Sequence, residues 1–256
     1  NFKFTQKPGE SQLGKTNGWW NRIKPADLDN DGDLDFVVAN HGLNSRFKAS
    51  AEKPVCMYVH DFVRNGATEH IICAFQGDKS YPMTLRHVLL SQIPSLKKKY
   101  LKYESYNDQI ITDIFTREEM AGALKLDAFE LASGTLINDG SGRFTFKPLP
   151  AEAQFSEMFA IEVADIDEDG FQDILLAGNL YRVKPEVGRY DASYGIFLKG
   201  RGAGNFQAVQ PGKSGLLIDG EARDFAFITI KEERLLMVAR NNDSILFFKS
   251  EPGEFQ

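Results

Sequence analysis

The chain has 256 residues and a formal net charge of -6, from 30 lysines and arginines against 36 aspartates and glutamates. Hydrophobic residues make up 42% of it, which is enough for a packed core and excludes a largely disordered chain. No apolar run approaches the length of about 18 residues that a membrane span needs, and two cysteines are too few for a disulfide scaffold or a four-cysteine zinc site. The acidic balance argues against a nucleic-acid partner, which selects a basic surface.

The chain starts without an initiating methionine or a signal peptide, and its segment 2–4 (Phe-Lys-Phe) resembles 144–146 (Phe-Thr-Phe). Because 144–146 follows a Gly-x-Gly turn, the turn that belongs to 2–4 is expected before residue 1. The chain ends on 253–255 (Gly-Glu-Phe), where another repeat is expected to begin. We therefore expect a C-terminal portion of a longer protein with upstream domains.

The first acidic loop spans 27–35 and carries aspartate at its positions 1, 3, 5, 7 and 9. Position 6 is Gly32, which can adopt positive φ without steric cost and so permits a sharp bend. The apolar run 36–39 that follows is typical of a β-strand. The pattern predicts a strand-loop-strand hairpin.

A weaker copy of this loop lies at 61–69. Asp61, Asn65 and Glu69 occupy positions 1, 5 and 9, whereas Val63 replaces the acid at position 3. We predict either a weak metal site formed by Asp61, Asn65 and Glu69 or an acidic turn without metal.

The two cysteines lie on either side of the 61–69 loop, on its flanking strands, and could be cross-strand neighbours. Cys73 aligns with the small apolar Ala177 of a later copy. Buried free thiols are therefore favoured over a disulfide between Cys56 and Cys73.

The segment 83–131 is predicted to be a helical insertion of two or three helices. Apolar residues recur near helical spacing in it, and Thr116 with Glu119 resembles a helix start with a capping box. The basic run 97–99 is interpreted as a solvated helix face, because the chain lacks a wider basic patch. The predicted domains are repeats at 1–82, this insertion, and further repeats at 132–256.

The second half of the chain repeats with a period of 62 residues. The Gly-x-Gly-x-Phe turn at 140–144 recurs at 202–206, and the acidic loop at 165–173 has a degenerate copy near 227–241, where Phe227 replaces the first aspartate. Each unit is predicted to hold four antiparallel strands, two flanking the acidic loop and two flanking the Gly-x-Gly turn. This is the pattern of a β-propeller blade, so we predict a mostly β fold of propeller blades that form a partial propeller, with a helical insertion.

The two dense acidic loops predict about two Ca²⁺ sites. Adjacent carboxylates repel one another unless a cation lies among them, and several hard oxygen ligands suit Ca²⁺ better than Mg²⁺. An EF-hand is excluded because its position 12 is Val38 or Leu176 here, within predicted strands. The alternative is an acidic turn without metal. The predicted ligands, with a carbonyl at position 7, are Asp27, Asp29, Asp31, Asp33 and Asp35 in the first loop, and Asp165, Asp167, Asp169, Phe171 and Asp173 in the second.

The pattern strand-Asp-x-Asp-x-Asp-Gly-x-x-Asp-strand, combined with Gly-x-Gly-x-Phe turns, resembles FG-GAP/VCBS repeat proteins. These are integrin-α-like β-propellers of bacterial secreted and surface proteins, and the resemblance covers most of the chain outside the helical insertion. It implies a calcium-stabilised propeller that is extracellular, at the cell surface or periplasmic, and that acts as a binding or scaffold module. The degenerate copy near 227 departs from the metal pattern, so no Ca²⁺ is expected there.

A second site is predicted on the propeller face opposite the acidic loops, where the links between blades gather. Aromatic, amide and arginine side chains there suit a carbohydrate or peptide ligand. The alternative is a purely structural role, in which the tryptophans pack between blades and the asparagines cap turns. The candidate residues are Trp19, Trp20, Arg22, Asn40, His41, Asn179, Tyr181, Arg182, Arg240 and Asn241.

No catalytic residue is predicted, because none of the four histidines lies in a nucleophile elbow, an HExxH motif or a metal triad. The histidines are His41, His60, His70 and His87. We expect a non-enzymatic calcium-binding module that recognises an extracellular protein or carbohydrate, or serves as a scaffold. The alternative is part of a secreted carbohydrate-active enzyme whose catalytic residues lie on the loop face or in missing sequence.

Overall fold

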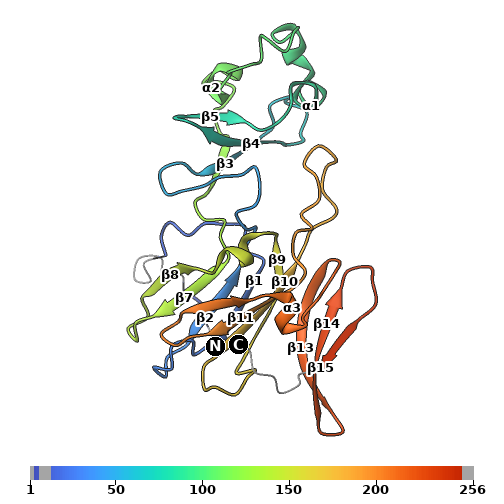
Figure 1. Cartoon of the computed structure of the whole chain (residues 1–256). Coiled ribbons are helices and arrows are strands. Elements are labelled where there is room, and N and C mark those ends of the chain that lie inside the picture. The colour runs from blue at the N-terminus through green and yellow to red at the C-terminus, as the bar shows by residue number, and fades with distance from the viewer. Residues whose placement is uncertain (1–2, 6–12, 250–256) are drawn as a thin grey trace. The chain divides into compact units, whose positions relative to one another are not determined.

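The computed structural model describes residues 3–5 and 13–249, which fall into two compact units (Figure 1). The first unit comprises Asn1–Gly14, Trp19–Ser45 and Leu131–Gln256, and the second comprises Lys15–Gly18 and Arg46–Glu130. Residue 2 and the segment 253–255, on which the expectation of a longer protein partly rested, lie outside the described residues. No helix in the described parts of the chain is long and apolar enough to cross a membrane.

The first sheet of the first unit is interrupted in sequence by Arg46–Glu130, the main segment of the second unit. Its antiparallel order is β1-β2-β7-β8, and the chain between β2 and β7 builds the second unit before returning. The 27–35 loop joins β1 to β2, and the 140–144 turn joins β7 to β8. The strands are β1 (Arg22–Ala26), β2 (Asp35–Ala39), β7 (Gly134–Asn138) and β8 (Phe144–Pro148).

Two further antiparallel sheets complete the first unit. The strands β9 to β12 follow one another as a four-stranded meander, in which the 165–173 loop joins β9 to β10. Strands β13, β14 and β15 form a three-stranded sheet. Their bounds are β9 (Met158–Ala164), β10 (Asp173–Gly178), β11 (Ile196–Gly200), β12 (Phe206–Val209), β13 (Ala222–Ile230), β14 (Glu233–Arg240) and β15 (Leu246–Lys249).

The predicted mostly β fold is confirmed, with three- and four-stranded antiparallel sheets, none of which closes on itself within the described residues. The degenerate copy differs from the acidic hairpins in its turn. Phe227 lies within β13, and the strand continues to a tight turn at Lys231 and Glu232, which have φ of 47° and 71°. Positive φ at two successive turn residues matches the twist of a two-residue hairpin, so no nine-residue loop forms there.

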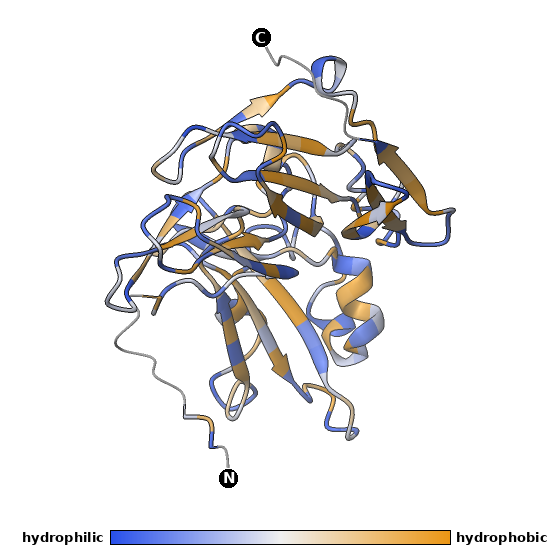
Figure 2. Cartoon of the chain, turned by 90° about the horizontal axis from the view of Figure 1, so that it is seen from below, coloured by the Kyte–Doolittle hydropathy of each residue, from blue (hydrophilic) through white to orange (hydrophobic). Residues whose placement is uncertain are grey.

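The core of the first unit lies on both faces of the β9–β12 sheet. Ile174 and Leu176 of β10 pack in a cluster with Val37 of β2, whereas Leu175 packs in a second cluster with Phe225 of β13. Because both faces are covered, β10 is apolar along a continuous run instead of alternating. In Figure 2 the apolar residues concentrate on the strands, and the loops are mostly polar.

The second unit contains its own antiparallel sheet, in the order β5-β4-β3-β6, and its helices pack on that sheet. The 61–69 loop joins β3 to β4, and the helices lie between β5 and β6 in sequence. Residues from the sheet and from the helical segment, among them Ile71, Leu89 and Ile114, share one core. The elements are β3 (Val55–His60), β4 (Glu69–Gln76), β5 (Lys79–Pro82), β6 (Leu124–Ala128), α1 (Arg86–Gln92), the 3-10 helix η1 (Pro94–Lys98) and α2 (Ile111–Ile114).

This unit divides the chain at other places than the sequence prediction did. The prediction separated 61–69 from a helical insertion at 83–131, whereas the main segment of the compact unit, Arg46–Glu130, contains both. The physical reason is that β6 pairs with β3, so the strands before and after the helical segment belong to one sheet. Cys56 and Cys73 are direct cross-strand partners in this sheet, and both are buried free thiols, as predicted.

Candidate metal sites and ligand surface

All three nine-residue loops have the same backbone turn. The aspartate at position 1 accepts a hydrogen bond from the glycine N–H at position 6, over 3.1 Å in the 27–35 loop, 2.8 Å in the 61–69 loop and 2.9 Å in the 165–173 loop. The acid at position 9 accepts the N–H of position 2 over 2.9 Å in each. The loop shape is therefore set by contacts between carboxylates and the backbone, which any of the three sequences can make.

Position 4 of each loop adopts the left-handed conformation. Its φ is 63° at Asn30, 58° at Arg64 and 59° at Glu168, and the glycines at position 6 have φ from 86° to 94°. The sequence pattern identified the glycine requirement, but not the strain at position 4, which falls on non-glycine residues.

The 27–35 loop brings three carboxylates together. Ligand oxygens of Asp27, Asp29 and Asp35 lie within 4.8 Å of one another. The Oδ1 atoms of Asp27 and Asp29 are buried and have no hydrogen-bond donor among the described residues. Burial, followed by the charges of Asp35 and Asp31, raises the pKa of Asp29. A bound cation would relieve both the missing donors and the repulsion.

Asp35 is the anchor of this cluster because its side chain is fully buried. Its two oxygens accept the backbone N–H groups of Leu28, over 2.9 Å, and Asn138, over 2.7 Å. The second of these donors belongs to β7, so the loop is fixed to a strand that follows it by about a hundred residues in sequence. Each carboxylate oxygen keeps a lone pair with which it could also bind a metal.

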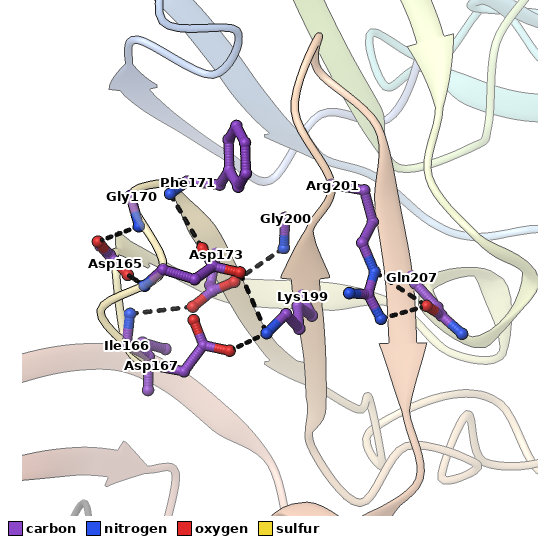
Figure 3. A network of polar contacts seen from close by, with 11 residues as sticks. Asp165, Ile166, Asp167, Gly170, Phe171, Asp173, Lys199, Gly200, Arg201 and Gln207 are labelled. Atoms are coloured by element: carbon purple, nitrogen blue, oxygen red, sulfur yellow. Dashed lines mark hydrogen bonds and ion pairs between the residues drawn. The ribbon is translucent and has the colours of Figure 1, made fainter. Parts of the chain in front are cut away.

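The 165–173 loop gathers Asp165, Asp167 and Asp169, whose ligand oxygens also lie within 4.8 Å of one another. Here an ammonium group lies among the carboxylates (Figure 3). Lys199 of β11 forms an ion pair with Asp167 and a second one with Asp169, over 3.1 Å. Asp173 accepts backbone N–H groups just as Asp35 does, and burial raises its pKa.

The ammonium group shifts the pKa values in this loop. Burial acts to raise the pKa of Asp169, but the Phe171 N–H and Lys199 outweigh it, and the net shift is downward. The pKa of Lys199 is raised, mainly by its hydrogen bond to Asp167 and also by its bond to Asp169. Desolvation acts to lower this pKa but is outweighed. The electrostatics of the two dense loops therefore differ although their turns agree.

The predicted ligands divide between those that gather and those that do not. Asp31 and Asp33 lie outside the first cluster, and Asp31 accepts the N–H of Asp33 over 2.9 Å. In the second loop the Asp173 carboxylate lies outside the cluster of side chains, and the carbonyl of Phe171 stays a predicted ligand.

The 61–69 loop contributes no metal cluster among the described residues. Hydrogen bonds from the N–H groups of Gly66 and Asn65 lower the pKa of Asp61. Glu69 accepts the N–H of Phe62. Val63 occupies position 3, and the remaining acids, Asp61 and Glu69, accept hydrogen bonds from backbone N–H groups of the loop.

Several residues of the predicted ligand face are committed to the fold. Asn40 is buried and its Oδ1 accepts the backbone N–H groups of Trp19 and His41. Asn179 is buried as well, and its amide exchanges hydrogen bonds with the Ser193 backbone. These contacts agree with the alternative of a structural role, in which the asparagines cap turns.

His41 and the last candidates also have partners within the first unit. His41 is only 3% exposed; it pairs with Glu157, and its ring meets the edges of Trp19 and Tyr190. Further contacts join Asn241 to Glu221, Arg240 to Asp219 and Asp243, Arg22 to Asp224, Trp20 to Phe146 and Tyr181 to Arg189. Arg182 is exposed.

A hollow that sequence reasoning missed lies at the strand ends opposite the 165–173 loop. It has a volume of about 220 Å³, and its lining includes Phe155, Tyr194, Glu152 and Gln210. Phe155 precedes β9 and Tyr194 precedes β11, whereas the loop joins β9 to β10. The two aromatic side chains are 45% and 54% exposed, so they are accessible to a ligand. An aromatic residue just before a strand was the only signal that could have identified them.

Comparisons with known proteins assign no family to this chain. No protein-family model matches it, and no curated protein matches it. The resemblance to FG-GAP/VCBS repeats therefore rests on the acidic loops and the Gly-x-Gly turns alone.

Proposed function

We propose that this chain is a non-enzymatic, calcium-binding β-propeller module that recognises an extracellular ligand. The observation that carries the proposal is the carboxylate cluster of Asp27, Asp29 and Asp35, with two buried oxygens that lack donors. Ca²⁺ takes about six to eight oxygen ligands in flexible geometry, so three carboxylates, loop carbonyls and water suit it better than Mg²⁺. Calcium bound there would tie the β1–β2 hairpin to β7 through Asp35.

The propeller assignment is supported by the way in which the sheets of the first unit pack. The β9–β12 meander has the β1-β2-β7-β8 core on one face and the β13–β15 core on the other. Propeller blades are four-stranded antiparallel sheets that cover one another face to face, and two of these three sheets have four strands. In such a ring, the acidic loops share one face and the Phe155–Tyr194 hollow lies on the other.

This hollow supports the ligand-binding part of the proposal. Exposed aromatic faces beside a carboxylate and an amide, as at Tyr194, Phe155, Glu152 and Gln210, favour a carbohydrate ligand. We test it on a glycan array with the wild-type chain and Tyr194→Ala. Glycan binding that Tyr194→Ala removes supports the assignment, and binding that the substitution leaves unchanged contradicts it.

The calcium claim is tested by isothermal titration of CaCl₂ into the metal-free chain. We compare the wild type with Asp29→Asn, which removes a charge from the cluster, and with Asp61→Asn, the matched control in a loop without a cluster. We expect binding by the wild type and the control, and strongly weakened binding by Asp29→Asn. Equal binding by all three, or no binding heat at millimolar calcium, contradicts the proposal.

A further inference from the structure

The most informative feature beyond the proposed function is the lysine inside the second acidic cluster. The Lys199 side chain is 13% exposed and that of its partner Asp167 is 9% exposed, so this ion pair is shielded from water. A second contact, 3.1 Å long, joins the ammonium group to Asp169. Figure 3 shows Lys199 reaching from β11 toward the carboxylates of the loop.

The strand register identifies the corresponding residue in the first sheet. Leu198 pairs with Ile174 in the β10–β11 ladder, and Leu136 pairs with Phe36 in the β2–β7 ladder. Ile174 and Phe36 each follow the position-9 aspartate of their loop. The next residue along β11 is Lys199, and the next along β7 is Ile137. The equivalent strand position is thus an ammonium group beside the 165–173 loop and, in the other sheet, an apolar side chain that packs against the core.

An ammonium group is a competitor for a metal ion at such a site. It carries positive charge and can donate up to three hydrogen bonds to carboxylate oxygens. Here it contacts Oδ2 of Asp167 and Oδ2 of Asp169, whereas Oδ1 of Asp167 is buried without a donor among the described residues. Calcium can enter only if the ammonium moves away, and a nearby positive charge disfavours the metal further. The cluster of Asp27, Asp29 and Asp35 faces no lysine at this strand position.

We propose that Lys199 serves as the built-in cation of the 165–173 loop, where it compensates the charge of the carboxylates without metal, and that the chain binds a single Ca²⁺ tightly, at 27–35. This inference rests on the proposed function, because it assumes that the chain binds Ca²⁺ and assigns that binding to one of two loops with similar ligand patterns. The lysine then determines which of the two loops responds to calcium.

The test uses calcium titration of the whole chain with substitutions at residue 199. Lys199→Met keeps the length of the side chain and removes the charge, and Lys199→Arg is the matched control that retains it. We expect one tight site in the wild type and in Lys199→Arg. In Lys199→Met, we expect a second site whose affinity is raised by at least about tenfold.

Asp29→Asn tests the same inference without altering the second loop, which matters if Lys199→Met fails to fold. Its remaining calcium binding reports on the 165–173 loop alone, and we expect it to be at least about tenfold weaker than that of the wild type. Two tight sites in the wild type, or a tight site that remains in Asp29→Asn, overturn the inference and leave calcium binding intact. No binding by the wild type, with one site gained in Lys199→Met, refutes the 27–35 site but supports the lysine. No binding by any variant refutes both.

Discussion

The 27–35 and 165–173 loops have the same turn but different electrostatics. In both, the position-9 aspartate is buried and accepts a backbone N–H from within the loop and another from the third strand of its sheet. The difference comes from a single position on that strand, which is Ile137 in one sheet and Lys199 in the other. A nine-residue motif therefore determines the shape of a loop, whereas a distant strand determines whether an ammonium group lies among its carboxylates.

The 61–69 loop shows that the shape of the turn does not depend on a carboxylate cluster. It makes the turn with Asp61, Gly66 and Glu69 although Val63 replaces the acid at position 3. The turn consequently needs the acids at positions 1 and 9 and the glycine at position 6, whereas both carboxylate clusters also include the acid at position 3.

The largest expected effect comes from removing the shared anchor. Asp35→Ala leaves the N–H groups of Leu28 and Asn138 without their buried acceptor, and we expect it to lower the free energy of unfolding by about 3 kcal/mol. Asp173→Ala should cost a similar amount, since the two anchors are equivalent. Urea denaturation in EDTA measures both, with Asp31→Ala as a control for an exposed acid of the same loop. Equal stability of Asp35→Ala and the control contradicts a structural anchor.

Calcium removal should separate the two loops next. If the 27–35 loop binds Ca²⁺, calcium at about a hundred times its dissociation constant adds about 2.7 kcal/mol to the free energy of unfolding. EDTA should abolish this gain in the wild type and have no effect on Asp29→Asn. Thermal unfolding with and without calcium measures the difference, and an EDTA effect of the same size in Asp29→Asn contradicts the assignment.

A smaller effect is expected from Lys199→Met in the absence of calcium. The substitution leaves Asp167 and Asp169 without their cation, and we expect a loss of about 1–2 kcal/mol in EDTA. Calcium should restore this loss by occupying the cluster, which a purely structural role for the lysine does not explain. Failure of millimolar calcium to restore stability, while Lys199→Met remains folded, argues against the exchange of one cation for the other.

The smallest effect is a difference in the sign of the pH dependence between the two loops, measured in EDTA. The pKa of Asp29 is raised above its ordinary value of 3.8, so its charge opposes folding as the pH rises above 3.8. The pKa of Asp169 is lowered, so its charge contributes stability above pH 3.8 that is lost as the pH falls below it. Relative to wild type, Asp29→Asn should gain stability between acid and neutral pH, whereas Asp169→Asn should lose it. The same sign for both substitutions contradicts this difference.

The acidic loops and their hairpins could be predicted from the sequence because their determinants are local. Aspartate at positions 1 and 9 and glycine at position 6 contact one another within nine residues, so the pattern 27–35 contains its own turn. Thr116 and Glu119 illustrate the opposite case. Their predicted capping box forms, with reciprocal bonds of 2.8 and 3.2 Å, yet the residues after it are turns and not a helix.

The features that escaped sequence reasoning depend on contacts between distant segments. Lys199 meets Asp167 across 32 residues, and only the register of β11 on β10 brings them together. The pairing of β6 with β3 likewise joins strands that are far apart in the sequence. For this reason the main segment of the second unit begins at Arg46 and not at the predicted residue 83. Burial of Asn40 could not be predicted either, because asparagine is mostly exposed and its partners come from separate loops.

The most direct test of the account is a crystal structure at millimolar calcium, with anomalous diffraction used to locate the ion. We expect one strong calcium peak among Asp27, Asp29 and Asp35, and the Lys199 Nζ atom among the carboxylates of the 165–173 loop. Absence of a peak at 27–35, with the carboxylates ordered, would contradict the calcium site. Equal peaks in both loops, with Lys199 turned away, would contradict the difference between them.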